Sequence, residues 1–80
     1  MDDQELVDTI NRLAHEEEDL YGRLGHGEAT GTDRRRLREI EVKLDQCWDL
    51  LHQRRARRRA GLDPDDAAVR DVSTVEGYVD

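Results

Sequence analysis

Arginine is concentrated at one point of this sequence, and the chemistry of arginine is anion recognition. Five arginines stand within six residues, at positions 54, 55, 57, 58 and 59. The planar guanidinium group forms paired hydrogen bonds with phosphate or carboxylate oxygens. Arg54, Arg55 and Arg58 are therefore a candidate site for an anionic nucleotide. The alternative, which we favour, is an internal network in which acidic segments of the same chain occupy these arginines.

Other reactive side chains lack companions at the spacing that chemistry requires. His15, Glu16 and Asp19 can share a helix face, but the run HEEED contains neither of the helical metal patterns HExxH and ExxH. Cys47 has carboxylates nearby rather than the basic, partly exposed setting of a reactive thiolate, and Ser73 is the only serine. We therefore expect no enzymatic activity, no bound metal and no cofactor.

Two further residues have both a structural and a functional interpretation. Trp48 is the largest apolar side chain, and we expect it to pack against a second copy of the chain rather than stack on a nucleotide base. Glu17 occupies an otherwise apolar helical position, where a buried carboxylate is costly unless it is paired. It is either a ligand or specificity device, or it bends out to meet Lys43 or an arginine of a second copy.

The composition leaves helices as the elements that must position these groups. Of 80 residues, 41% are charged and 35% hydrophobic, with no Phe and one Pro, which excludes a β-sandwich or barrel and leaves little material for a deep pocket. No apolar run approaches the roughly 20 residues needed to span a bilayer, and the start lacks the pattern of a signal peptide. With a single cysteine as well, we expect a cytoplasmic protein without a membrane segment.

Heptad-like spacing of apolar residues predicts two helices. The helices should span about residues 3–24 and 33–60, with a glycine-rich loop at 25–32. Their apolar seams are Leu6, Ile10, Leu13, Leu20 and Leu24 in the first, and Leu37, Ile40, Leu44, Cys47 and Leu51 in the second. Thr32 is the cap that we favour for the second helix, with Thr30 in a capping box with Asp33 as the alternative, and Gly61 followed by Leu62 should end the helix.

The charge layout predicts that the two helices fold into an antiparallel hairpin. Residues 33–60 carry a net charge of +5, whereas residues 2–24 carry −6 and residues 61–80 carry −5. Folding at the loop pairs residues whose numbers sum to about 60, which places Asp2–Asp8 beside Arg54–Arg59 and Glu16–Asp19 beside Arg34–Arg38. The acidic tail, residues 61–80, either docks through short helical turns carrying Val72, Val75, Tyr78 and Val79 or extends as an arm.

A two-helix unit with a broad apolar face usually buries it against a second copy. The fold class is therefore all-α: a coiled-coil-like hairpin, residues 1–60, that dimerises into a four-helix bundle. The predicted interface consists of Leu13, Leu44, Cys47, Trp48 and Leu51. The leading functional hypothesis is a small interaction or regulatory module that associates with itself and with a protein partner; the alternative is a regulator that binds an anionic nucleotide. Nucleic acid is not an expected partner, because internal carboxylates compete for the arginines.

The segment LDQCWDLLHQRRA, Leu44 to Ala56, followed by AGLDPD, resembles a small actinobacterial helical family of unknown function. The resemblance extends to the Glu16–Glu17 pair, the glycine loop and the VEGY sequence that begins at Val75. It implies a short helical protein with no established activity. The architecture is also similar to actinobacterial hairpin anti-sigma factors that bind cyclic di-GMP, but the run from Glu41 does not reproduce their signature residues.

Overall fold

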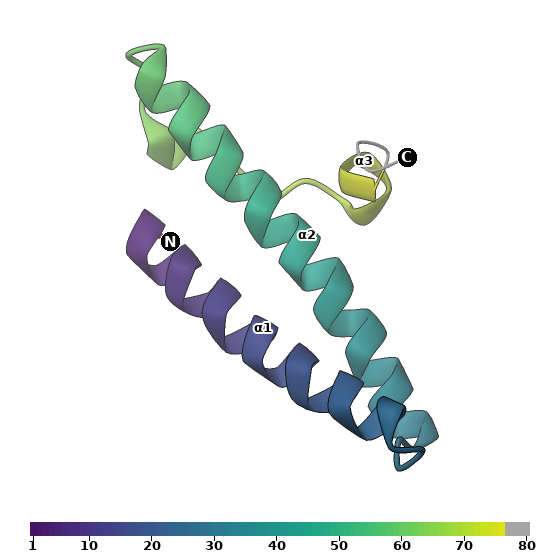
Figure 1. Ribbon diagram of the computed structural model, residues 1–80. Coiled ribbons are helices and arrows are strands. Elements are labelled where there is room, and N and C mark those ends of the chain that lie inside the picture. The colour runs from purple at the N-terminus through teal and green to yellow at the C-terminus, as the bar shows by residue number, and fades with distance from the viewer. Residues whose placement is uncertain (77–80) are drawn as a thin grey trace.

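Two long helices lie side by side in opposite directions in the computed structural model, which describes residues 1–76 (Figure 1). Helix α1 spans Asp3–Gly25 and α2 spans Gly31–Arg59. A 3₁₀ turn, η1, follows at Pro64–Asp66, and a short helix, α3, at Val72–Glu76. No strand occurs in this described part of the chain. The predicted all-α antiparallel hairpin is confirmed.

Capping boxes start both long helices. The Asp2 carboxylate accepts a hydrogen bond from the backbone N–H of Glu5 at the start of α1. At α2, the Thr30 hydroxyl accepts from the Asp33 N–H at 3.1 Å, and the Asp33 carboxylate accepts from the Thr30 N–H at 3.1 Å. Thr30 is thus the cap, and α2 begins at Gly31, two residues before the predicted start. The cap that we favoured, Thr32, is wrong, because it lies inside the first turn of α2.

Glycines in the left-handed conformation end both long helices. Gly27 has a φ of 72° and Gly61 a φ of 75°. Past each glycine the chain turns back, so that the N–H of Glu28 donates to the Arg23 carbonyl at 2.9 Å and the N–H of Leu62 to the Arg57 carbonyl at 2.8 Å. These six-to-one hydrogen bonds define Schellman motifs, which satisfy carbonyls that a helix end leaves free. Gly61 was the predicted stop of the second helix.

The hairpin core consists of two clusters that follow the predicted pairing of the helices. One contains Leu6, Ile10, Leu50 and Leu51, and the other contains Leu13, Leu20, Leu37 and Ile40. Leu44 and Cys47 pack against both clusters from α2. Leu24 remains exposed, because α1 ends one residue later.

The tail docks on α2 rather than extending from it. Figure 1 shows α3 on the side of α2 away from α1, and Val75 there is buried. The amide of Gln53 donates to the Ala68 carbonyl at 2.9 Å, and Arg70 lies 3.1 Å from the carboxylate of Asp49. Side chains of α2 thus bond a backbone carbonyl and a charged side chain within residues 68–70. Tyr78 and Val79, which we assigned to the same docking segment, lie outside the described residues.

Within residues 1–76, no helix combines the length and the apolar character that crossing a bilayer requires.

Candidate functional site

The predicted arginine cluster lies where the open end of the hairpin meets the tail. Arg54 is 6% exposed, and its guanidinium group reaches two acidic segments at once. Its Nε donates to Oδ1 of Asp3 at 2.6 Å, and its Nη1 donates to Oδ1 of Asp65 at 2.9 Å and to the Pro64 carbonyl at 3.2 Å. One side chain of α2 therefore joins α1 to η1.

Burial of this charge is tolerated because its polar atoms are satisfied. Arg54 continues the apolar seam of α2 three residues after Leu51, so its methylene stem lies on the core while its head reaches the carboxylates. Hydrogen bonds from Arg54 and Arg58 hold the pKa of Asp3 below its ordinary value. The same carboxylates raise the pKa of Arg54, so the pair is ionised at neutral pH.

Neighbouring arginines are divided between bonded and free. Arg58 lies 2.8 Å from Oδ2 of Asp3, so that one carboxylate holds two guanidinium groups. Arg57 donates to the Asp63 carbonyl at 2.6 Å. Arg55 is exposed and makes no hydrogen bond or ion pair with the described part of the chain. The internal network that we favoured for this cluster is confirmed for Arg54, Arg57 and Arg58. Arg55 and Arg58 also line a surface pocket of about 290 Å³ together with Arg59, whereas Arg54 does not line it.

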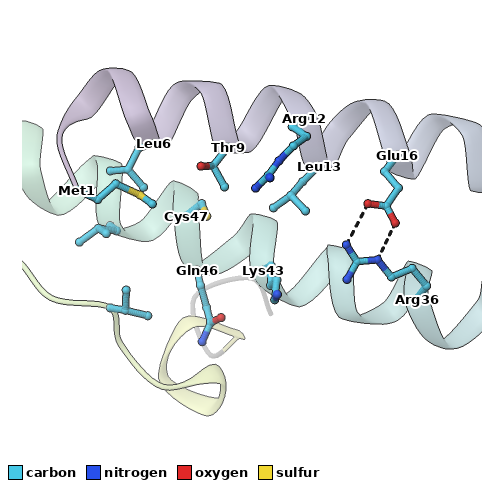
Figure 2. A pocket seen from close by; sticks show the side chains of 12 residues that line it. Met1, Leu6, Thr9, Arg12, Leu13, Glu16, Arg36, Lys43, Gln46 and Cys47 are labelled. Carbon is cyan, nitrogen blue, oxygen red and sulfur yellow. Dashed lines mark hydrogen bonds and ion pairs between the residues drawn. The ribbon is translucent and has the colours of Figure 1, made fainter.

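A groove of about 450 Å³ runs between α1, α2 and the tail (Figure 2). Its floor is apolar, with Leu6, Leu13 and Leu50. The carboxylate of Glu16 and the guanidinium group of Arg36 form two hydrogen bonds across it, at 2.6 and 2.9 Å. These bonds hold the pKa of Glu16 below its ordinary value. The predicted contact between Glu16–Asp19 and Arg34–Arg38 is thus present as this bidentate pair.

Cys47 lies in the same groove and is partly buried. Burial raises the pKa of its thiol, so the thiol stays protonated at neutral pH. A protonated, partly buried thiol is a poor nucleophile. This setting agrees with the expectation that Cys47 is a seam residue.

The opposite side of the hairpin presents aromatic side chains to solvent. Trp48 is 44% exposed and Tyr21 is 48% exposed. The Tyr21 hydroxyl donates to Oε1 of Glu41 at 2.7 Å, which raises the pKa of the phenol. Ala14 stands seven residues before Tyr21 in α1, and Trp48 stands seven residues after Glu41 in α2. Because the helices are antiparallel, Ala14 lies beside Trp48. We call this surface the tryptophan face; it comprises Ala14, Tyr21, Glu41, Asp45, Trp48, His52 and Arg55.

The residues predicted to form a dimer interface fall into two groups. Leu13 and Leu51 are 5% and 1% exposed, so the hairpin itself already buries them and they are core residues rather than contacts between copies. Leu44 and Cys47 are half-buried against the core clusters between α1 and α2. Of the five residues, only Trp48 is exposed. The dimer stays a prediction.

Glu17 is half-buried on the Tyr21 side of α1. Lys43, its predicted partner, instead lines the groove together with Glu16. Among residues 1–76, no three His, Cys, Asp or Glu side chains gather in a way that could hold a metal ion. Glu16, one of the three residues weighed as metal ligands, is engaged by Arg36.

Sequence reasoning missed the polar residues that hold the tail. Gln46, Asp49 and Gln53 recur at three- and four-residue intervals on α2, and each contacts residues 68–70. This polar stripe beside an apolar seam was the available signal. It became informative only once the tail was seen to lie along it.

These features define a small helical hairpin with an apolar–aromatic face and a salt-bridged end, closed by a docked tail. The chain belongs to the family described as "Protein of unknown function (DUF2630)", whose model matches residues 2–80. It is 48% identical over 77 residues to uncharacterized proteins of Mycobacterium bovis and Mycobacterium tuberculosis, covering 95% of this chain and 88% of each relative. No solved structure matches the chain. The resemblance to a small actinobacterial family is confirmed.

Proposed function

We propose that this protein is a small non-enzymatic interaction module that associates with itself, and as an assembled helix bundle with a protein partner. The observation that carries the proposal is the exposure of Trp48 at the middle of the longer helix. Tryptophan buries more apolar area than any other side chain and is the residue most enriched at the centres of protein interfaces. Tyr21 extends the same surface along α1.

Within residues 1–76, the contacts that bury the other sides of α2 can be assigned to α1 and to the tail. Helix α1 covers the seam of α2, and the tail covers the stripe marked by Gln46, Asp49 and Gln53. By helical periodicity, the tryptophan face lies on a different side of α2 from both the seam and this stripe, and Trp48 at its centre is exposed. A second hairpin placed there would form a four-helix bundle, the usual way for helical hairpins to bury such a surface.

Reactive groups are occupied in ways that support a non-enzymatic role. The Cys47 thiol is kept protonated by burial, and the hydroxyl of Ser73 donates to Asp71 at 2.7 Å. The nucleotide-binding alternative requires Arg54, Arg55 and Arg58 to be available together. Because Asp3 holds two of these three, an anion would first have to displace it. We therefore base the proposal on association between helices.

The test is the mass of the protein in solution, measured by sedimentation at micromolar concentration. The proposal predicts twice the chain mass of 9.3 kDa for the wild type and a shift to monomer for Trp48→Ala. Val69→Ala is the matched control, since Val69 is also exposed but lies on the groove side. A wild type that stays monomeric contradicts the proposal. Affinity capture with the intact protein tests the proposed protein partner. If only copies of this chain are recovered, the proposal of a partner is abandoned.

A further inference from the structure

Charge is distributed unevenly along the tryptophan face. Toward the N-terminus of α2, Asp45 and Glu41 stand three and seven residues before Trp48. Toward the C-terminus, His52 and Arg55 stand four and seven residues after it. One end of the face is therefore acidic and the other basic, with the indole between them.

Helix α1 strengthens this asymmetry. Its direction is opposite to that of α2, and the bond between Tyr21 and Glu41 sets the register. Glu17 and Glu18 consequently fall at the acidic end, while Val7 and Asn11 fall beside Arg55. The whole face is an electrical dipole along the helix axis.

Both ends have unused bonding capacity. Arg55 makes no hydrogen bond or ion pair with residues 1–76. Glu41 accepts the Tyr21 hydroxyl through Oε1, and a carboxylate can accept further hydrogen bonds through its second oxygen. A partner that brings a cation to Glu41 and an anion to Arg55 would form an ion pair at each end of the face. The tryptophan face of a second copy carries such a cation and anion, Arg55 and Glu41, with the same 14-residue spacing.

We infer that two copies join through the tryptophan face in antiparallel orientation, with a two-fold axis beside Trp48 that pairs Glu41 with the partner's Arg55. This inference rests on the proposed self-association and specifies its geometry. Across such an axis, facing residues of the two α2 helices have numbers that sum to 96. Glu41 and Arg55 satisfy this sum, so the ion pair forms twice, once on each side of the paired tryptophans.

A parallel arrangement gives the opposite electrostatic result. It would place Glu41 against the partner's Glu41 and Arg55 against the partner's Arg55, and like charges across an interface are strongly unfavourable. Burial of the two indoles supplies attraction in both orientations. The charged flanks therefore decide the orientation, which is the usual role of ion pairs at the rim of an interface.

A distance between labels separates the two orientations. A nitroxide is attached to a cysteine at position 32, in the first turn of α2, in a Thr32→Cys, Cys47→Ala chain, and the distance between copies is measured by double electron–electron resonance. Antiparallel helices with the axis at residue 48 put the two labels 32 residues apart along the bundle, or about 48 Å at 1.5 Å per residue. Parallel helices put them roughly 10–20 Å apart.

Charge reversal tests the specific pair. Glu41→Arg and Arg55→Glu are each expected to raise the dimer dissociation constant about tenfold or more, and the double variant to return it to within about threefold of the wild type. Tyr21→Phe measures the loss of the hydroxyl bond alone. Arg35→Glu is the charge-matched control, because Arg35 is exposed on another side of α2.

The outcomes distinguish the two proposals. A dimer with the short label distance, or one in which the double variant is as weak as both single variants, overturns the antiparallel pairing and leaves self-association in place. If both the labelled chain and the wild type sediment only as monomers at every concentration, the antiparallel pairing and the self-association are both overturned. The long distance together with rescue by the double variant establishes the inferred geometry.

Discussion

Arg54 of α2 donates to Asp3 of α1 across 2.6 Å, although the arginine is almost fully buried and the two residues lie 51 positions apart in the chain. The same guanidinium group donates to Asp65 in η1. The beginning of the chain, the end of the long helix and the start of the tail therefore depend on one side chain. No buried side-chain polar atom in the described residues lacks a hydrogen-bond partner, so this charge is fully compensated.

Arg54→Lys is expected to lower the melting temperature by roughly 10 °C, because an ammonium group cannot reproduce the fork that bonds two carboxylates at once. Arg59→Lys is the matched control: Arg59 is exposed in the last turn of α2, and this change should have almost no effect. Circular dichroism at one fixed protein concentration measures both. Equal melting temperatures would show that Arg54 does not join the three segments.

Acid should destabilise the fold through its paired carboxylates. Arg36 holds the pKa of Glu16 below its ordinary value of 4.5, and Arg54 with Arg58 holds that of Asp3 below 3.8. The folded state thus binds these protons less tightly than the unfolded state does. The stabilisation is complete above the unfolded-state values and is lost as the pH falls through the lowered folded-state values.

Thermal melts between pH 7 and pH 2 should therefore show a melting temperature that falls as the pH drops below about 4.5. Glu16→Gln is expected to reduce this dependence, since its amide does not titrate. Glu18→Gln serves as the control, because Glu18 is exposed and makes no ion pair with residues 1–76. A Glu16→Gln curve parallel to that of the wild type would be incompatible with the proposed linkage.

The start of α2 offers a comparison between two threonines two positions apart. Thr30→Ala removes the hydroxyl that accepts the Asp33 N–H, and loss of such a cap costs about 0.5–2 kcal/mol of unfolding free energy. Thr32→Ala leaves the capping box intact and places a better helix former in the first turn. Urea titration should show a clear loss for the first variant and none for the second. The reverse order would mean that the helix begins at Asp33.

Glycines at two kinds of position should respond in opposite directions to alanine. Gly22 lies inside α1 with open space around its Cα, so Gly22→Ala is expected to stabilise the protein by roughly 0.5–1 kcal/mol. Gly27 also has open space but a φ of 72°, so Gly27→Ala should destabilise it by about 1–2 kcal/mol. Because neither alanine meets a neighbouring atom, the difference in urea midpoint measures backbone conformation alone.

Local signals in the sequence predicted the elements well. The apolar spacing of three and four residues places Leu6, Ile10 and Leu13 on one stripe, and all three are in the core. The stop at Gly61 followed by Leu62 also depends on a short window of residues. The antiparallel hairpin follows instead from the opposite net charges of residues 2–24 and 33–60, and the ion pair between Arg58 and Asp3 agrees with it. The cap of α2 was predicted wrongly, since both Thr30 and Thr32 fit the local pattern and only the hydrogen bonds show that Thr30 is used.

The candidate site was harder to predict, because its members come from distant segments. Arg54, Arg55 and Arg58 look alike in sequence, yet Arg54 is buried and bonded to two carboxylates, Arg58 shares one of them, and Arg55 is free of partners within residues 1–76. Leu13 and Leu51 likewise fit an interface between copies as well as a core. Their burial within one hairpin depends on how closely α1 and α2 approach.

The sequence by itself determined the helices, their ends and their antiparallel pairing, since periodicity, capping residues and net charge act over short distances or along whole faces. The tertiary structure decided where the tail lies, which arginine is buried and which side of α2 stays open. Those outcomes depend on single contacts such as Val75 on α2 and Arg54 on Asp65. The free energy of such a contact exists only when two remote segments meet, and no local window of residues contains both.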